Sequence, residues 1–592
     1  MNNDNKTVKV VLIVIGIIPV TWAALVVAPF VSQGLTGIIA GFTAAMKHPP
    51  TLTWCEDSMK TIAICLMCYG LGLGVYYSSQ HNYRRGMEHG SAKWGFPKAL
   101  CRKYADKMES ENVILTENVR IGLNGRKHRR NLNILCVGGS GSGKTRHYAK
   151  VNILQANTSF LVLDVKGEIL RDTGKLLEEK GYEIRVFDLV NMEKSHGYNP
   201  LQYLRDEKDV LKLVTNLVRN TTPKGAQSND PFWERAETAL LEALILYLKS
   251  EAPADEQNFP MIMEMISAAE VREEDEGYAS VLDELFERLE MRDPENLAVK
   301  QYHIFKLAAG KTAKSILISL GVRLEKFNLS QIASIVTHDE LDLPSLGTKK
   351  VALFAIIPDN DSSLNFLIGM LYTQLFQELF YLADHSKDGR LPVHVHCVMD
   401  EFANVALPDD FDKLLSTMRS REVSASIILQ NIAQLKALFE KQWESIIGNC
   451  DEFLYLGGNE QSTHKYVAEL LGKETIDVNT YGKSSGRNGN YSTNYQLSGR
   501  ELLDPSEVRM LDNRYALLFI RGERPIQDEK YDILKHPNIA LTTDGGAPAY
   551  IHGQAPFSFE PESIFLGGEY EDYEVLSEED VNELFEKENN NE

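Results

Sequence analysis

Residues 132–145 read Leu-Asn-Ile-Leu-Cys-Val-Gly-Gly-Ser-Gly-Ser-Gly-Lys-Thr, an apolar run followed directly by a glycine-rich loop. The loop has the spacing G-x-x-x-x-G-K-T, in which Gly138 and Gly143 frame it and Lys144 and Thr145 end it. Glycines let consecutive backbone N–H groups converge on phosphate oxygens, and the helix expected after Gly143 adds its positive end. The stretch therefore predicts a nucleoside triphosphate site in an α/β fold.

The residues of this phosphate loop have separate expected roles. We expect the Lys144 ammonium to reach the β- and γ-phosphates of ATP and the Thr145 hydroxyl to bind Mg²⁺. An ordinary Gly/Ser-rich turn is the alternative, and the strand before the loop and the helix after it disfavour that interpretation. The residues expected to surround the phosphates are Gly138, Gly139, Ser140, Gly141, Ser142, Gly143, Lys144 and Thr145.

Beyond residue 130, apolar strands alternate with amphipathic helices, which is typical of a doubly wound α/β sheet. Residues 206–342 have helical periodicity and almost no strand signal. We interpret them as an all-α domain inserted into the sheet, with helices that simply cover the sheet as the alternative. The expected strands are 132–137, 159–164, 182–187, 350–357, 393–399, 424–429, 452–456 and 514–520.

The strand expected at 393–399 ends in two carboxylates, Asp400 and Glu401. Asp400 is suited to hold Mg²⁺ through its water shell, and Glu401 to polarise the attacking water. Adjacent residues on a strand point to opposite faces, but the turn at its carboxyl end lets both side chains face the cleft. The alternative is an acidic strand end in solvent.

Residues 418–431 read Met-Arg-Ser-Arg-Glu-Val-Ser-Ala-Ser-Ile-Ile-Leu-Gln-Asn, a basic turn followed by a strand that ends at Gln430. In ring-forming motors an arginine reaches the γ-phosphate of a neighbour, and Arg421 is the candidate here, with Arg419 as second choice. A surface arginine that binds DNA or a carboxylate is the alternative. Gln430 is placed either to sense the γ-phosphate or to cap the strand.

Two uncharged apolar stretches near the amino terminus, 10–31 and 61–80, are long enough to cross a bilayer. A cleaved signal peptide is the alternative for the first stretch, and its length disfavours this. The positive-inside rule places the chain after residue 80 in the cytoplasm, and two spans place the amino terminus there too. The basic residues behind this prediction are Arg84, Arg85, Lys93, Lys98, Arg102 and Lys103.

The net charge of −21 gives no overall basic surface, although nucleic-acid-binding proteins are usually basic somewhere. Much of the acid lies in residues 556–592, where Lys587 is the only basic residue, whereas 120–130 is strongly basic. A ring that translocates DNA needs positive charge only in its channel. The acidic composition therefore does not exclude a DNA motor.

Taken together, these motifs resemble the type IV secretion coupling proteins, the TraG/TraD-like membrane ATPases of conjugation systems. The resemblance covers the chain from the first span to about residue 540, with Val165 where the family usually has proline. Asp164 and Lys166 either face the nucleotide or belong to a structural turn. Besides the phosphate loop, the motifs are His89-Gly-Ser-Ala-Lys-Trp-Gly, Leu163-Asp-Val-Lys-Gly-Glu, Asn199-Pro, Asp230-Pro-Phe-Trp, Asp400-Glu-Phe-Ala-Asn, Arg419-Ser-Arg and Gln430-Asn-Ile-Ala-Gln-Leu.

The resemblance implies a RecA-like P-loop NTPase with an inserted all-α domain, preceded by two transmembrane helices. It also implies ATP and Mg²⁺ as cofactors, a homohexamer in the cytoplasmic (inner) membrane, and recruitment of relaxase-bound, single-stranded DNA to a type IV secretion channel. The alternatives are a substrate receptor that uses nucleotide only as an assembly switch, and a chromosome-segregation DNA translocase. The expected domains are a membrane anchor (1–80), a basic juxtamembrane linker (81–130), a nucleotide-binding domain in two parts (131–205 and 343–545), the all-α insertion (206–342) and an acidic tail (546–592).

Overall fold

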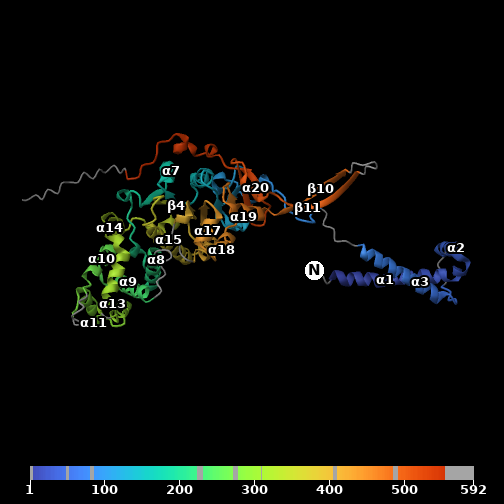
Figure 1. The fold of residues 1–592 in the computed structure, drawn as a ribbon, viewed down its shortest axis with the longest axis horizontal. Helices are drawn as coiled ribbons and strands as arrows, with labels where there is room; N and C mark the ends of the chain where they lie inside the picture. The colour runs from blue at the N-terminus through green and yellow to red at the C-terminus, as the bar shows by residue number, and fades with distance from the viewer. Residues whose placement is uncertain are drawn as a thin grey trace, which may run out of the picture. The chain divides into compact units, whose positions relative to one another are not determined.

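The computed structural model describes residues 4–47, 52–79, 86–222, 231–270, 278–308, 310–404, 410–483 and 491–553. The chain divides into two compact units, one formed by 1–91 with 473–500 and the other by 92–472 with 501–592 (Figure 1). Most of the expected acidic tail, 554–592, lies outside the described residues, as do Arg84, Arg85 and Asp230.

The first unit contains apolar helices. They are α1 (Asp4–Val27), α2 (Gly34–Lys47) and α3 (Ser58–Ser78), with a 3-10 turn, Ala28–Gln33, after α1. Ile13–Ala44 and Ser58–Tyr76 are long and apolar enough to cross a membrane. The Tyr69 hydroxyl donates a hydrogen bond to the Ile13 carbonyl at 3.2 Å, beside Gly16, where a side chain would collide with the tyrosine ring. A small residue thus allows α1 and α3 to approach closely, as is common between membrane helices.

The same unit holds a two-stranded hairpin that the sequence analysis missed, β10 (Lys473–Lys483) with β11 (Tyr491–Glu501). The Thr475 hydroxyl accepts hydrogen bonds from the amides of His89 at 3.0 Å and Gly90 at 3.2 Å. The first motif after the second span therefore packs against this hairpin.

The second unit is built on a nine-stranded sheet in the order β13-β12-β9-β3-β8-β7-β4-β6-β5. Neighbouring strands are parallel from β9 to β5, and β12 and β13 are antiparallel. All eight expected strands are present within two residues of their predicted ends, which confirms the α/β fold; β13 was not predicted. The strands are β3 (Ile134–Val137), β4 (Ser159–Val165), β5 (Glu183–Asp188), β6 (Val351–Ile357), β7 (Val395–Met399), β8 (Val423–Leu429), β9 (Glu452–Tyr455), β12 (Tyr515–Ile520) and β13 (Ile526–Glu529).

The carboxyl ends of the parallel strands lie along one edge of the sheet, which we call the site edge. Alternating strand residues point to two apolar layers, because side chains on a strand alternate between faces. One layer includes Val151 and Leu176, from α6 and α7, and the other includes Leu371 from α15. The covering helices are α6 (Lys150–Leu154), α7 (Glu168–Glu179), α15 (Asn365–His385), α16 (Phe411–Met418), α17 (Ile432–Leu438), α18 (Trp443–Gly448), α19 (Gln461–Leu471) and α20 (Pro505–Arg509).

Residues 97–128, part of the expected linker, are folded onto the second unit. They form α4 (Pro97–Tyr104), the two-stranded sheet β1 (Asn112–Ile114) with β2 (Arg120–Gly122), and α5 (Gly125–His128). Ile114 and Ile121 are buried in the same apolar layer as the first helices after the phosphate loop. This part of the chain therefore serves as core as well as connection.

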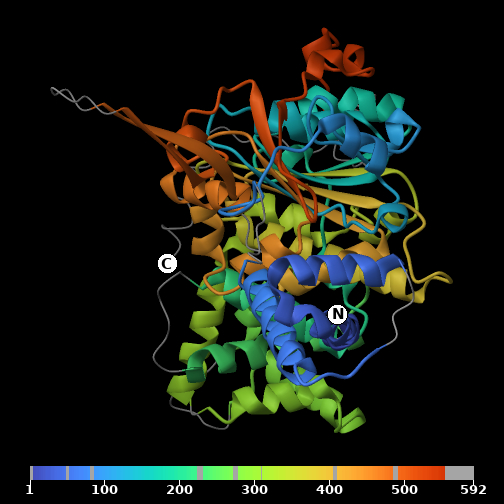
Figure 2. The same cartoon turned by 90° about the vertical axis from the view of Figure 1, so that its right-hand side faces the viewer.

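The inserted helices lie between β5 and β6 and gather on one side of the sheet, coloured green (Figures 1 and 2). Two ring stacks fill their interior, Phe259 on Phe327 at 4.2 Å and Phe286 on Tyr302 at 4.0 Å. Their apolar core is continuous with one layer of the sheet. The helices are α8 (Glu207–Thr221), α9 (Pro231–Glu251), α10 (Phe259–Ala268), α11 (Val281–Arg292), α12 (Leu297–Lys306), α13 (Gly310–Leu324) and α14 (Ser330–Thr337).

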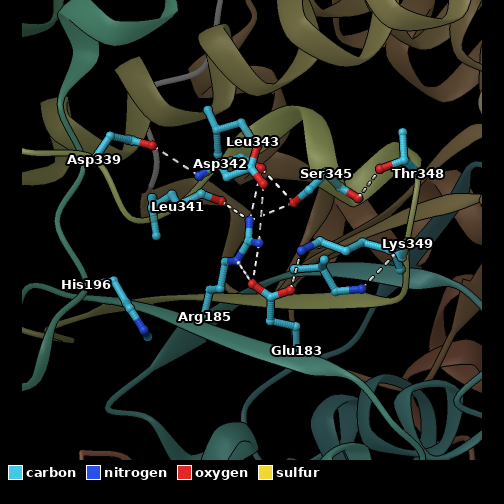
Figure 3. Close-up of polar contacts among 12 residues, drawn as sticks. Glu183, Arg185, His196, Asp339, Leu341, Asp342, Leu343, Ser345, Thr348 and Lys349 are labelled. Atoms are coloured by element: carbon cyan, nitrogen blue, oxygen red, sulfur yellow. Dashed lines mark hydrogen bonds and ion pairs between the residues drawn. The ribbon is translucent and has the colours of Figure 1, made fainter.

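A buried arginine on the edge strand fastens the chain where the insertion returns to the sheet (Figure 3). Arg185 on β5 donates hydrogen bonds to the carbonyls of Leu341 and Asp342, the latter at 2.9 Å, and to the Ser345 hydroxyl at 2.7 Å. Its guanidinium also pairs with Glu183. One side chain thus satisfies several polar groups at the entrance to β6.

We expect Arg185→Met to leave the Leu341 and Asp342 carbonyls without their donor, at a cost of about 1–3 kcal/mol. Hydrogen exchange of the full-length protein should become faster in the peptide covering 338–349. Lys349→Met is the matched control, because it removes only an exposed ion pair to Glu183, at 2.5 Å. Equal exchange in the two variants would contradict this assignment.

Candidate nucleotide site

The phosphate loop joins β3 to a helix and needs glycine at two left-handed positions. Gly141 has φ 76° and Gly143 has φ 81°, values that residues with a side chain adopt only under strain. The helix opens with a π-helical turn, Thr145–Ala149, before α6. Single π turns inside helices are rare, and those that occur are often found at functional sites.

The Lys144 side chain packs against the backbone of the phosphate loop. Its ammonium donates a hydrogen bond to the Gly138 carbonyl at 2.9 Å, and the residue is 8% exposed. The buried Ser142 hydroxyl has no hydrogen-bond partner among the described residues. The Lys144 ammonium and the Ser142 hydroxyl can both donate hydrogen bonds. They fit a ligand that is anionic and rich in acceptors, as a triphosphate is.

The two residues expected to hold Mg²⁺ touch each other. The Thr145 hydroxyl donates to the Asp400 carboxylate at 2.7 Å, and burial raises the pKa of Asp400 while this hydrogen bond opposes the rise. A hydroxyl and a carboxylate are oxygen ligands of the kind that Mg²⁺ prefers. In the described part of the chain no group of three or more His, Cys, Asp or Glu could hold a metal ion. Mg²⁺ itself takes few protein ligands and completes its shell with water and phosphate.

The contact chain continues from Asp400 to Gln430. Glu401 has φ 53°, a left-handed conformation, and its amide donates to the Asp400 carboxylate at 3.0 Å. The Gln430 side-chain amide donates to the two Glu401 carboxylate oxygens at 3.2 and 3.1 Å. The strained backbone at Glu401 turns the chain so that both carboxylates lie at the site edge. Thr145, Asp400, Glu401 and Gln430 thus form one connected group from three adjacent strands.

Arg421 is not part of this group. It lies in a 3-10 turn, Arg419–Arg421, that precedes β8, so it sits at the edge of the sheet opposite the phosphate loop. Its guanidinium forms a bidentate pair with Asp384, at 2.8 and 3.0 Å, and lies 4.8 Å from the centre of the Phe380 ring. Arg419 donates to the Gly125 carbonyl at 3.4 Å. Neither arginine reaches the nucleotide site of its own subunit.

Lys530, which the sequence did not predict, supports the phosphate loop from the end of β13. Its ammonium donates to the Ser142 carbonyl at 2.8 Å and to the Asn513 side chain at 2.7 Å. Burial lowers the pKa of Lys530 to about 8. Next to it, the Tyr531 carbonyl lies 2.8 Å from the His147 ring. No local motif marks these residues, because their partners are close only in the folded sheet.

Asp164 has a structural role in the described site. It is 1% exposed, and one of its carboxylate oxygens accepts from the Leu170 amide in α7 at 2.8 Å. The other oxygen has no hydrogen-bond partner among the described residues, and burial raises the pKa of Asp164 to about 7. Lys166 pairs with Asp359 at 2.5 Å. These contacts favour the structural turn.

The raised pKa of Asp164 gives a pH-dependent prediction. The folded state holds the proton up to about pH 7, whereas the unfolded chain releases it near 3.8, so the contribution of Asp164 to stability falls as pH rises between these values. Asp164→Asn keeps an acceptor and removes the charge. We therefore expect its melting temperature, relative to the native protein, to rise between pH 5 and pH 8.

The matched control for this measurement is Asp359→Asn. The ion pair with Lys166 lowers the pKa of Asp359, so its carboxylate stays ionised in both states throughout this range. Its melting temperature relative to the native protein should stay constant between pH 5 and pH 8. An equally constant difference for Asp164→Asn would show that Asp164 is ionised in the fold.

Comparisons with known proteins agree on one family. The family described as type IV secretory system conjugative DNA transfer matches residues 101–543. Protein VirD4 of Rhizobium radiobacter is 21% identical over 405 residues, which cover 67% of this chain and 56% of VirD4. Conjugal transfer protein TraG of the same species is 20% identical over 409 residues, which cover 66% of this chain and 60% of TraG. The matched part is thus less than two thirds of the length of either relative.

Solved structures with the same fold include the bacterial conjugative coupling protein TrwB. Its trigonal form in complex with sulphate superposes with a TM-score of 0.56 at 16% identity and covers 80% of this chain and 99% of that chain. TrwB in complex with ADP and Mg²⁺ has a TM-score of 0.53 at 16% identity, covering 74% of this chain and 94% of that chain. These matches confirm the predicted RecA-like P-loop fold. By its phosphate loop, its sheet order and the family match over residues 101–543, the chain belongs to the type IV secretory system conjugative DNA-transfer family.

Proposed function

We propose that this chain is a membrane-anchored coupling ATPase of conjugation. In this proposal it binds ATP and Mg²⁺, assembles as a homohexamer and passes relaxase-bound, single-stranded DNA to a type IV secretion channel. The observation that carries the proposal is the connected group Thr145–Asp400–Glu401–Gln430 beside the phosphate loop. Support for the cofactors comes from TrwB, whose structures include complexes with ADP and Mg²⁺ and with a non-hydrolysable ATP analogue.

In the proposed reaction each residue acts on the triphosphate from a fixed place. Backbone amides of the phosphate loop and the Lys144 ammonium bind the phosphates. Thr145 and Asp400 would hold Mg²⁺, which neutralises phosphate charge when bound. Glu401 orients the attacking water, and the Gln430 amide holds the Glu401 carboxylate in place. Movement of Gln430 toward the γ-phosphate would release Glu401, so this pair can report the state of the nucleotide.

The position of Arg421 supports a ring. Because Arg421 lies at the edge opposite its own phosphate loop, a role in hydrolysis would have to be at the site of another subunit. An arginine supplied in this way stabilises the charge of the transition state. Asp384 forms a bidentate pair with the Arg421 guanidinium at the surface and so fixes its position. We propose that Arg421 leaves Asp384 for the γ-phosphate of the neighbouring subunit.

The membrane anchor belongs to the same proposal. Ile13–Ala44 and Ser58–Tyr76 would span the cytoplasmic membrane and keep both termini in the cytoplasm, where ATP is available. Lys93, Lys98 and Arg102 follow the second helix, in agreement with the positive-inside rule. The nucleotide-binding unit would then lie at the cytoplasmic entrance of the channel.

The test is ATP hydrolysis by the full-length protein in nanodiscs, with and without single-stranded or double-stranded DNA. We expect DNA to stimulate hydrolysis, and Glu401→Gln to reduce the turnover rate by about 100-fold or more, because it removes the group that orients the water. Lys144→Ala should abolish it. Lys166→Ala is the control, because this exposed lysine forms its ion pair with Asp359, just after the neighbouring strand β6.

Two outcomes would contradict the proposal. Nucleotide binding without turnover under any DNA condition would favour a receptor that uses nucleotide as an assembly switch. Unchanged turnover in Glu401→Gln would mean that the water is oriented by another group.

A further inference from the structure

A line of hydrogen-bonded side chains crosses one face of the central sheet. The Ser424 hydroxyl lies 2.7 Å from the His394 ring and 2.7 Å from the His396 ring. The second nitrogen of His396 lies 2.8 Å from the Ser426 hydroxyl, which in turn lies 2.6 Å from the Tyr148 hydroxyl. His396 on β7 and Ser424 on β8 are register partners, Ser426 is the next same-face residue of β8, and His394 directly precedes β7.

The line ends at two elements of the proposed reaction, the turn that carries Arg421 and the π-helical turn that follows the phosphate loop. At one end, Glu422 contacts the His394 ring at 3.2 Å and Arg390 at 3.1 Å. Glu422 has φ 61° and directly follows Arg421. At the other end, Tyr148 belongs to the π-helical turn Thr145–Ala149, which begins with the expected Mg²⁺ ligand. The line therefore joins the Arg421 turn to the phosphate loop of the same subunit.

Burial makes these polar groups costly unless all are paired. His396, Ser424, Ser426 and Tyr148 are between 1% and 5% exposed. Apolar residues at the same positions would avoid the cost of burying polar groups. The next same-face residue of β8, Ile428, is apolar. Every hydroxyl and ring nitrogen of the line has a partner within it. A complete polar line through an apolar layer indicates a function beyond packing.

One continuous direction for the hydrogen bonds is assigned here from the network. The Glu422 carboxylate can only accept, so the His394 nitrogen that faces it donates, and the other His394 nitrogen is assigned as the acceptor of the Ser424 hydroxyl. Ser424 then accepts from His396. Burial lowers the pKa of His396 to about 3, so this ring is neutral and its other nitrogen accepts from Ser426. Ser426 finally accepts from the Tyr148 hydroxyl.

We propose that Glu422, His394, Ser424, His396, Ser426 and Tyr148 form a relay that couples the Arg421 turn to the phosphate loop of the same subunit. When Arg421 leaves Asp384 for a neighbouring nucleotide, Glu422 withdraws from His394 and the fixed direction is lost. The Tyr148 hydroxyl can then change from donor to acceptor, which alters how the π-helical turn with Thr145 is held. The relay residues are positioning residues, and the proposal rests on the ring ATPase proposed above.

Such a relay makes one subunit's site respond to nucleotide in the next, so binding should be cooperative. The experiment is equilibrium binding of a fluorescent, non-hydrolysable ATP analogue to the full-length protein in nanodiscs. We expect a Hill coefficient of about 2 for the native protein and about 1 for Ser424→Ala, which breaks the relay between its two histidines. Ser424→Thr keeps the hydroxyl and should restore cooperativity.

Ser159→Ala is the matched control, because Ser159 is a buried serine of the same sheet whose hydroxyl donates to the Lys349 carbonyl at 2.7 Å, outside the relay. Tyr148→Phe provides a second break, with Tyr182→Phe as its control, since the Tyr182 hydroxyl donates to the Thr158 carbonyl at 2.6 Å. Both controls should bind cooperatively.

Non-cooperative binding by the native protein would overturn the relay, as would equal Hill coefficients for Ser424→Ala and Ser159→Ala. Because the analogue is not hydrolysed, this result is independent of turnover. Relay-dependent cooperativity in a protein that hydrolyses no ATP would overturn the ATPase proposal and leave the relay in place.

Discussion

The hydrogen bond between Thr145 and Asp400, at 2.7 Å, is the contact on which the site depends. It joins residues 255 positions apart in the sequence, and only the order β3-β8-β7 brings them together. Because these strands are parallel, their carboxyl ends share one edge, where the loop, the acidic pair and Gln430 meet. Displacement of β8 or β7 in the sheet would separate the phosphate loop from both carboxylates.

Two buried side chains near the outer strands stabilise the sheet, Lys530 at the site edge and Arg185 at the opposite edge, where the chain enters β6. On one side, antiparallel β13 brings Lys530 beneath the phosphate loop, where it holds the Ser142 carbonyl at 2.8 Å. On the other side, Arg185 secures the segment that returns from the inserted helices to β6. The insertion thus interrupts the chain between β5 and β6, which remain paired, without disturbing the strands that carry the site. The polar relay across β7 and β8 lies between these two supports.

Much of the site was predictable because its residues follow local rules. The glycine spacing of the loop, the acidic end of β7 and the alternating apolar strands are each visible in a short window of sequence. The roles of Lys530 and of the relay from Glu422 to Tyr148 could not be predicted, because their partners lie far along the chain. The location of Arg421 at the opposite edge followed only from strand direction. Part of the expected linker, around Ile114 and Ile121, proved to be core, because its short strands carry too weak a pattern to stand out.

We propose that a complete nucleotide site needs two subunits, with the phosphate loop from one and Arg421 from the other. Mixing full-length Lys144→Ala protein with Arg421→Ala protein tests it, because Lys144→Ala subunits still offer an intact Arg421 to the intact phosphate loops of their partners. We expect each variant alone to hydrolyse almost no ATP and the mixture to recover activity. A mixture no more active than the average of the two variants would contradict it.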